Sequence, residues 1–201
     1  VDTIDTPSGS GNITLNRPVT GLSGSGASLT SLPAAPRKSL IMNGEMVVTQ
    51  RGTSATGVTA TGYNACDRWA IEITGSPSTA YTIEQSTDTP DGFNHSLKVT
   101  TTTANASLSA GHRVQVRTRM EGQDLQHLKF GTSSAESLTV SFWVKATKTG
   151  TSCVGFFQLN GAKVASRQFT INSTATWEYK TATFSGNTAD TIANSNAHGY
   201  N

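Results

Sequence analysis

The chain has 201 residues, a formal net charge of +2 and a charged fraction of 14%, well below the roughly 25% usual in globular proteins. Its many Thr and Ser residues favour strands and turns over long helices, and the lack of a basic excess argues against binding of nucleic acid through bulk charge. No apolar run approaches the ~18 residues needed to cross a bilayer, so no membrane insertion is expected.

The first 39 residues are punctuated by Gly, Ser, Thr and Pro and contain no aromatic residue. Such a segment cannot bury enough apolar area to offset its own ordering entropy, although residues 13–15 alternate as in a short strand. A flexible spacer and an extended arm that orders on a partner both fit this composition. Scattered single apolar residues favour the arm, because a pure spacer needs none. The predicted attachment residues are Ile4, Ile13, Leu15, Val19, Leu22, Leu29 and Leu32.

A boundary is predicted near residues 33–38, where two prolines and two cations form a stiff, solvated joint. We therefore expect an extended attachment arm and linker over residues 1–39. Residues 40–201 are expected to form a β-sandwich domain.

Strand and turn signals alternate after residue 40, and strand-like segments recur roughly every 8–15 residues, which is typical of a sandwich rather than of βαβ units. Residues 138–144 have the most apolar bulk and are predicted to form a central strand. Asn160-Gly161 predicts a hairpin turn, and residues 121–129 predict a short helix with Leu125 and Leu128 on one face. The expected strand segments are 46–48, 69–73, 81–84, 96–100, 114–118, 138–144, 154–159, 163–169 and 177–184.

The two cysteines, Cys66 and Cys153, allow at most one disulfide. That is too few for a small secreted scaffold held together by disulfides. We expect two buried free thiols in a protein made in a reducing cytosol.

No catalytic pattern stands out in the chain. Glycoside hydrolysis needs two carboxylates about 5–10 Å apart across a cleft, but Asp88 and Asp91 bracket a turn that contains Pro90, and Asp67 beside Arg68 is typical of a structural ion pair. The histidines lack metal-ligand spacing, and no nucleophile elbow or phosphate-binding loop is present. The sequence therefore predicts a protein that is not an enzyme, with no catalytic residue, no metal and no cofactor.

Aromatic residues are the candidates for contact with a sugar, because a ring can stack on a pyranose face. Trp143 stands among apolar neighbours, and Trp69 and Trp177 begin alternating strands, so all three are expected in the core. Tyr63 and Phe93 lie in loop-like surroundings and are the predicted glycan-binding residues.

Several stretches match, in order and spacing, one known kind of domain: LIMNGEM at 40–46, QRG at 50–52, DRW at 67–69, SFWVK at 141–145 and TWEYKT at 176–181, with shorter matches at 85–86, 96–100 and 121–122. Together they resemble the jelly-roll domain of bacteriophage tail-fibre and related virion proteins, which is similar to carbohydrate-binding modules. The resemblance covers roughly residues 40–192. Residues 1–4 and 7–11 also resemble the N-terminal segments of phage fibre and appendage proteins.

This resemblance implies a jelly-roll-like β-sandwich in a structural virion protein of a tailed phage, assembled in the bacterial cytoplasm and displayed on the particle surface. Its arm would attach to other virion proteins of the tail or capsid, and its sandwich would project outward as a homotrimeric tail fibre that recognises a host-surface glycan. A capsid-attached head fibre or decoration protein, and a free carbohydrate-binding module, are the alternatives. In the family, further strands follow the equivalent of residues 181–188, so we expect either a shortened domain or a natural chain that continues beyond Asn201.

Overall fold

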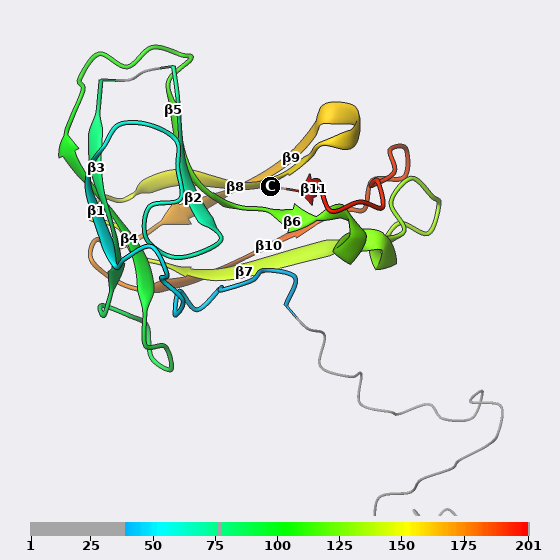
Figure 1. The fold of residues 1–201 in the computed structure, drawn as a ribbon, viewed down its shortest axis with the longest axis horizontal. Helices are drawn as coiled ribbons and strands as arrows, with labels where there is room; N and C mark the ends of the chain where they lie inside the picture. Colours follow the sequence, from blue (N-terminus) through cyan, green and yellow to red (C-terminus); the bar gives the residue numbers. More distant parts are fainter. Residues whose placement is uncertain (1–38, 76–77, 201) are drawn as a thin grey trace, which may run out of the picture. The chain divides into compact units, whose positions relative to one another are not determined.

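The computed structural model describes residues 39–75 and 78–200 (Figure 1). The chain divides into two units, Val1–Lys38 and Ser39–Asn201, and the predicted attachment residues lie outside the described residues. The described part consists of antiparallel strands and short 3₁₀ helices, which confirms the predicted all-β class. The elements are β1 (Ser54–Val58), β2 (Trp69–Thr74), β3 (Ala80–Ser86), β4 (Ser96–Thr103), β5 (Arg113–Thr118), β6 (Met120–Glu121), η2 (Gly122–Leu128), β7 (Leu138–Val144), β8 (Gly150–Gln158), η3 (Asn160–Ala162), β9 (Lys163–Ile171), β10 (Glu178–Phe184) and β11 (His198–Tyr200).

The strands form sheets with the orders β1-β3-β4, β2-β5, β10-β7 and β6-β11-β8-β9. Most of the predicted strand segments coincide with these strands, because alternation of apolar and polar residues marks a half-buried strand. η3 follows β8 directly and precedes β9, which places the predicted turn at Asn160-Gly161 between two paired strands. In the described part of the chain no helix is long and apolar enough to span a bilayer.

Two separate hydrophobic cores hold the sheets together. The first joins the β1-β3-β4 sheet to the β2-β5 pair, and the second lies under η2. As predicted, Leu125 and Leu128 of η2 are both buried, because they lie on the same side of this short helix. The first core consists of Val58, Ala65, Ile71, Tyr81 and Ile83, and the second of Met120, Leu125, Leu128, Phe130 and Ile192.

The β7-β10 pair packs on the β8-β9 pair through aromatic side chains. Phe142 of β7 contacts Phe169 of β9 edge to face, with ring centroids 5.1 Å apart. Phe156 of β8 contacts Phe184 of β10 in the same way at 4.8 Å. These contacts fill the space between the two strand pairs and give this part of the body its sandwich character.

Three sequence expectations about strands and cysteines are wrong. Residues 138–144 form β7 as predicted, but in the described part of the chain β7 pairs with β10 alone and is not central. Residues 46–48 form no strand, because their backbone groups bond within a turn and to side chains. Met46 N donates to the Asn43 carbonyl at 3.1 Å, and Gln85 Nε2 donates to the carbonyl oxygens of Met46 and Val47 at 2.6 and 3.1 Å. Cys66 is buried as predicted, whereas Cys153 is exposed, because strand β8 is covered only near its end.

Residues from the stretches that carry the family resemblance meet in one hydrogen-bond network. Asn43 Nδ2 donates to the carbonyl oxygens of Val48 and Asp67 at 3.0 and 2.8 Å. The Asn43 carbonyl accepts from Trp69 Nε1 at 2.9 Å, and Asp67 N donates to the Val48 carbonyl at 2.9 Å. This network connects the segment before β1 to the start of β2 and fixes the turn that carries Arg68.

Candidate functional site

The outward face of the β7-β10 pair presents aromatic and hydroxyl side chains to solvent. Along β7 the exposed residues alternate with half-buried ones, because successive side chains of a strand point to opposite faces. The register pairs Thr139 with Thr183, Ser141 with Thr181 and Trp143 with Tyr179. All six of these residues are exposed, so one face of the pair carries two aromatic rings at one end and hydroxyl groups along the remainder.

Trp143 and Tyr179 form the aromatic part of this surface, which we call the aromatic face. Their ring centroids lie 5.3 Å apart with an interplanar angle of 57°, and the two residues are 41% and 56% exposed. The expectation that Trp143 belongs to the core is wrong. Its neighbours Phe142 and Val144 point inward, so Trp143 must point outward, and this sheet is covered on one side only.

A polar cluster lies at the end of the β7-β10 pair, where residue 145 follows β7 and residue 177 precedes β10. Lys145 Nζ donates to both carboxylate oxygens of Asp88 at 2.8 and 2.6 Å, and Trp177 Nε1 donates to Asp88 Oδ1 at 3.1 Å. Lys145 Nζ also lies 5.9 Å from the centroid of the Trp177 ring. The hydrogen bonds from Lys145, and then from Trp177, lower the pKa of Asp88 below its ordinary value, which keeps its carboxylate charged.

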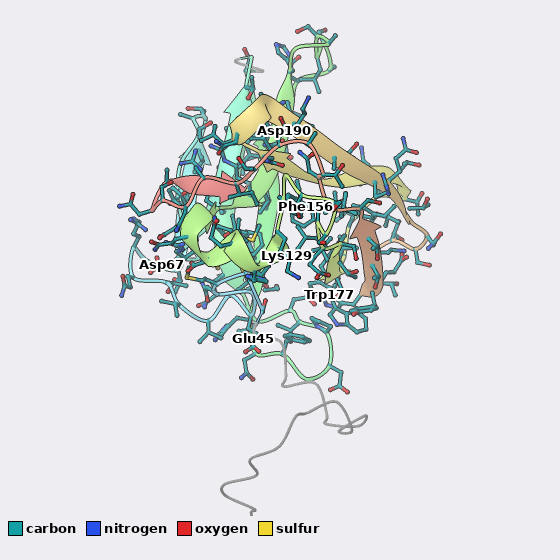
Figure 2. All side chains as sticks on the ribbon, turned by 90° about the vertical axis from the view of Figure 1, so that its right-hand side faces the viewer. Glu45, Asp67, Lys129, Phe156, Trp177 and Asp190 are labelled. Atoms are coloured by element: carbon teal, nitrogen blue, oxygen red, sulfur yellow. The ribbon has the colours of Figure 1, made fainter. Side chains whose placement is uncertain are left out.

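The core expectation for Trp177 and Trp69 is only partly met. Both residues are half-buried, and each indole N–H has a hydrogen-bond acceptor: Asp88 for Trp177 and the Asn43 carbonyl for Trp69. A half-buried tryptophan usually donates its indole N–H to an acceptor while the remainder of the ring contacts apolar groups or water. Trp177 immediately precedes β10 and lies beside it in Figure 2.

The two predicted glycan-binding residues, Tyr63 and Phe93, are each 39% exposed. Tyr63 lines a pocket together with Arg51, Arg68 and Arg119, whereas Phe93 is not among the residues that line it. The structure therefore does not bring the two predicted residues together in this pocket. Strict alternation in residues 139–145 was the signal that could have found Trp143 as an outward residue.

Two of the carboxylates considered for catalysis, Asp67 and Asp88, are engaged in ion pairs. Asp67 Oδ1 lies 3.6 Å from Arg51 Nη1 rather than pairing with its neighbour in sequence, and Asp88 binds Lys145. Glu178 accepts hydrogen bonds from Lys180, Asn172 and Ser173, which lower its pKa to about 2. A general acid for glycoside hydrolysis needs a raised pKa. Among residues 39–75 and 78–200 no group of three or more His, Cys, Asp or Glu side chains could hold a metal ion.

The chemistry that suits the aromatic face is non-covalent binding of a saccharide. Exposed aromatic rings offer large, rigid apolar surfaces to the C–H groups of a sugar ring. The threonine and serine hydroxyls beside them donate and accept hydrogen bonds. Asp88 and Lys145 add one charged acceptor and one charged donor at the end of the face.

Comparison with models of protein families finds no family that matches the chain, and comparisons with curated proteins and with solved structures find no match either. The assignment of a function therefore depends on the geometry of the described residues and on the motif resemblance.

Proposed function

We propose that the chain is a non-enzymatic structural protein of a tailed-phage particle, a tail fibre whose β-sandwich binds a host-surface glycan. The glycan-binding part of the proposal depends on one observation above all: Trp143 and Tyr179 stand side by side on a solvent-exposed sheet face. A domain of this size usually buries large aromatic side chains or uses them for contact with a partner.

The glycan is expected to bind along the β7-β10 pair. A sugar ring stacks on Trp143 and Tyr179, and the following sugar units run past the hydroxyls of Ser141 and Thr181. Neighbouring strands lie about 5 Å apart, so the face of β7 and β10 is a narrow strip that suits an extended oligosaccharide chain. Trp177 closes one end through its bond to Asp88.

The particle-attachment part depends on the resemblance of residues 1–11 and 40–192 to phage fibre proteins. An arm with scattered apolar side chains gains partners only on the particle, and binding orders it. Deletion of residues 1–32 should abolish incorporation into particles while the β-sandwich stays folded. Normal incorporation of the deleted protein would contradict the attachment role, and electron microscopy of labelled particles would separate a tail position from a capsid position.

A glycan array probed with the full chain tests the binding role. Trp143→Ala/Tyr179→Ala should lose binding to the neutral glycans that the unchanged protein binds. Val164→Ala, which removes an exposed apolar side chain from β9, should bind as the unchanged protein does. If the double variant binds normally while Phe93→Ala does not, the site lies at the loop around Phe93 and the aromatic face is not the binding surface. Light scattering on the same samples tests the proposed homotrimer.

A further inference from the structure

A second surface carries a different chemistry. A pocket of about 370 Å³ lies within the size range of small-molecule sites, and side chains from four separate segments line it. Figure 2 separates Asp67, which contacts one of the pocket's arginines, from Trp177, which adjoins the aromatic face. The pocket is therefore a site of its own. Its polar and aromatic lining residues are Arg51, Tyr63, Arg68, Arg119, Glu121 and Asn196.

The charges of the lining favour an anion. Three guanidinium groups face one carboxylate, that of Glu121. The nearest atoms of Arg68 and Glu121 are 3.9 Å apart, and those of Arg51 and Asp67 are 3.6 Å apart. Both separations exceed a hydrogen-bond length. An arginine has five N–H donors in a planar fork, so these loose ion pairs position Arg51 and Arg68 and leave donors directed at solvent.

The backbone of Arg68 supports a positioned role for its side chain. Arg68 has φ = 72°, a left-handed conformation that non-glycine residues seldom adopt and that clusters at binding sites. The residues on both sides of it are held in place: Asp67 N donates to the Val48 carbonyl at 2.9 Å, and Trp69 N donates to the Cys66 carbonyl at 3.3 Å. The turn thus holds the Arg68 guanidinium at the pocket instead of letting the chain relax.

Tyr63 supplies the apolar part of the pocket. Its ring is partly exposed, and the Arg51 guanidinium carbon lies 5.9 Å from the ring centroid, within the range of a cation–π contact. A pocket that combines guanidinium donors, one aromatic ring and the acceptors of Glu121 and Asn196 matches a sugar ring that bears a carboxylate. The carboxylate takes a bidentate pair of bonds from arginine, the ring contacts Tyr63, and the hydroxyls bond to Glu121 and Asn196.

We propose that this pocket binds an acidic sugar unit through its carboxylate, at a site separate from the aromatic face. The choice of a sugar rests on the proposed glycan-binding function, but the anion site does not. A glycan that occupied both surfaces would carry neutral units on the aromatic face and a uronic acid or a similar acidic unit in the pocket.

The test uses the full chain, titrated with D-galacturonate, its neutral counterpart D-galactose and galactose 6-phosphate, and followed by NMR chemical shifts. Galacturonate should bind at least about tenfold more tightly than galactose, since bonds to charged groups discriminate by that much or more. Arg68→Asn keeps a residue that tolerates the left-handed backbone but removes the guanidinium, and it should weaken galacturonate binding about tenfold or more. Arg51→Gln should act in the same direction.

Two controls separate this proposal from the proposed function. Arg113→Gln removes an exposed guanidinium on β5 that pairs with Glu72, and it should leave the affinity unchanged. Trp143→Ala/Tyr179→Ala should also keep galacturonate binding, even if glycan binding on the array is lost. Equal affinity for galactose and galacturonate, or galacturonate binding that survives both pocket variants, would overturn the proposal. Tighter binding of galactose 6-phosphate that Arg68→Asn abolishes would overturn the choice of a carboxylate.

Discussion

Replacement of Trp143 by alanine tests which side of β7 faces the solvent. About 60% of the side chain is withdrawn from water, since the residue is 41% exposed. For an aromatic side chain of roughly 200 Å², about 120 Å² is then covered. At ~25 cal/mol per Å² this corresponds to about 3 kcal/mol, and a compact denatured state lowers it to about 2 kcal/mol. No internal cavity forms, because water fills the vacated space.

Phe184→Ala is the matched control on the partner strand. Phe184 is 2% exposed and packs edge to face on Phe156. Its truncation removes a fully buried ring and leaves a cavity, which typically costs about 3–5 kcal/mol. The two variants should therefore differ by about 2 kcal/mol, with Trp143→Ala the more stable.

Urea denaturation of the full chain, followed by circular dichroism and extrapolated linearly to water, measures both values. The comparison needs equal m-values for the two variants, since a changed m-value indicates a changed denatured state. If Trp143→Ala costs as much as Phe184→Ala or more, Trp143 lies in the core, and the aromatic face does not exist as described.

Three other predictions concern stability and reactivity. Glu178 has a folded-state pKa of about 2 against an ordinary value of 4.5, chiefly because it accepts a hydrogen bond from Lys180. The stability that the charged Glu178 contributes is complete above about pH 4.5 and is lost as the pH falls toward 2. In urea melts at decreasing pH, the difference in stability between Glu178→Gln and the unchanged protein should therefore disappear over that interval. Cys153 is exposed, whereas burial raises the pKa of the Cys66 thiol; a thiol reagent should modify one cysteine quickly in the native protein, and Cys153→Ser should remove that fast phase. Gln158 is 1% exposed, and its Nε2 donates to two backbone carbonyls of the C-terminal segment at 3.0 and 3.1 Å. Gln158→Leu leaves these carbonyls without this donor and should lower the free energy of unfolding by about 2–4 kcal/mol in urea melts. A decrease below about 1 kcal/mol would contradict these hydrogen bonds.

The strands with clear alternation were predictable from the sequence, and those without it were not. Residues 138–144 alternate between apolar and polar side chains except at Trp143, and they form β7 with the same bounds. Ser54–Val58 forms β1 although it contains Gly57 at φ = 65° and mostly small side chains. Such a segment has little β-propensity of its own, and pairing with β3 holds it in place. Its existence is therefore a tertiary effect.

The candidate site was less predictable than the fold, because a large aromatic residue on the polar face of a strand is easily assigned to the core. In β7, one face carries Phe142 and the other Trp143, and both are large and aromatic. Phe142 shares its face with apolar residues and Trp143 shares its face with Thr139 and Ser141, and the contact of Phe142 with Phe169 of β9 confirms that Phe142 is the inward residue. The pocket arginines were equally hidden, since Arg51, Arg68 and Arg119 are far apart in sequence and meet only after the sheets have formed.

The buried residues of the described part form two small cores, which leave aromatic and charged side chains on the surface. Each core gathers a few side chains from neighbouring strands, so the β7-β10 pair has only one covered face, and its other face keeps Trp143 and Tyr179 in solvent. With a charged fraction of 14%, the chain has few charged side chains to offset the aggregation risk of an exposed aromatic surface. Under the proposed function, stacking on a glycan would cover both rings. The partly exposed ion pairs of Arg51 and Arg68 add little to stability, and a carboxylate bound in the pocket, as proposed, would give both side chains a stronger partner.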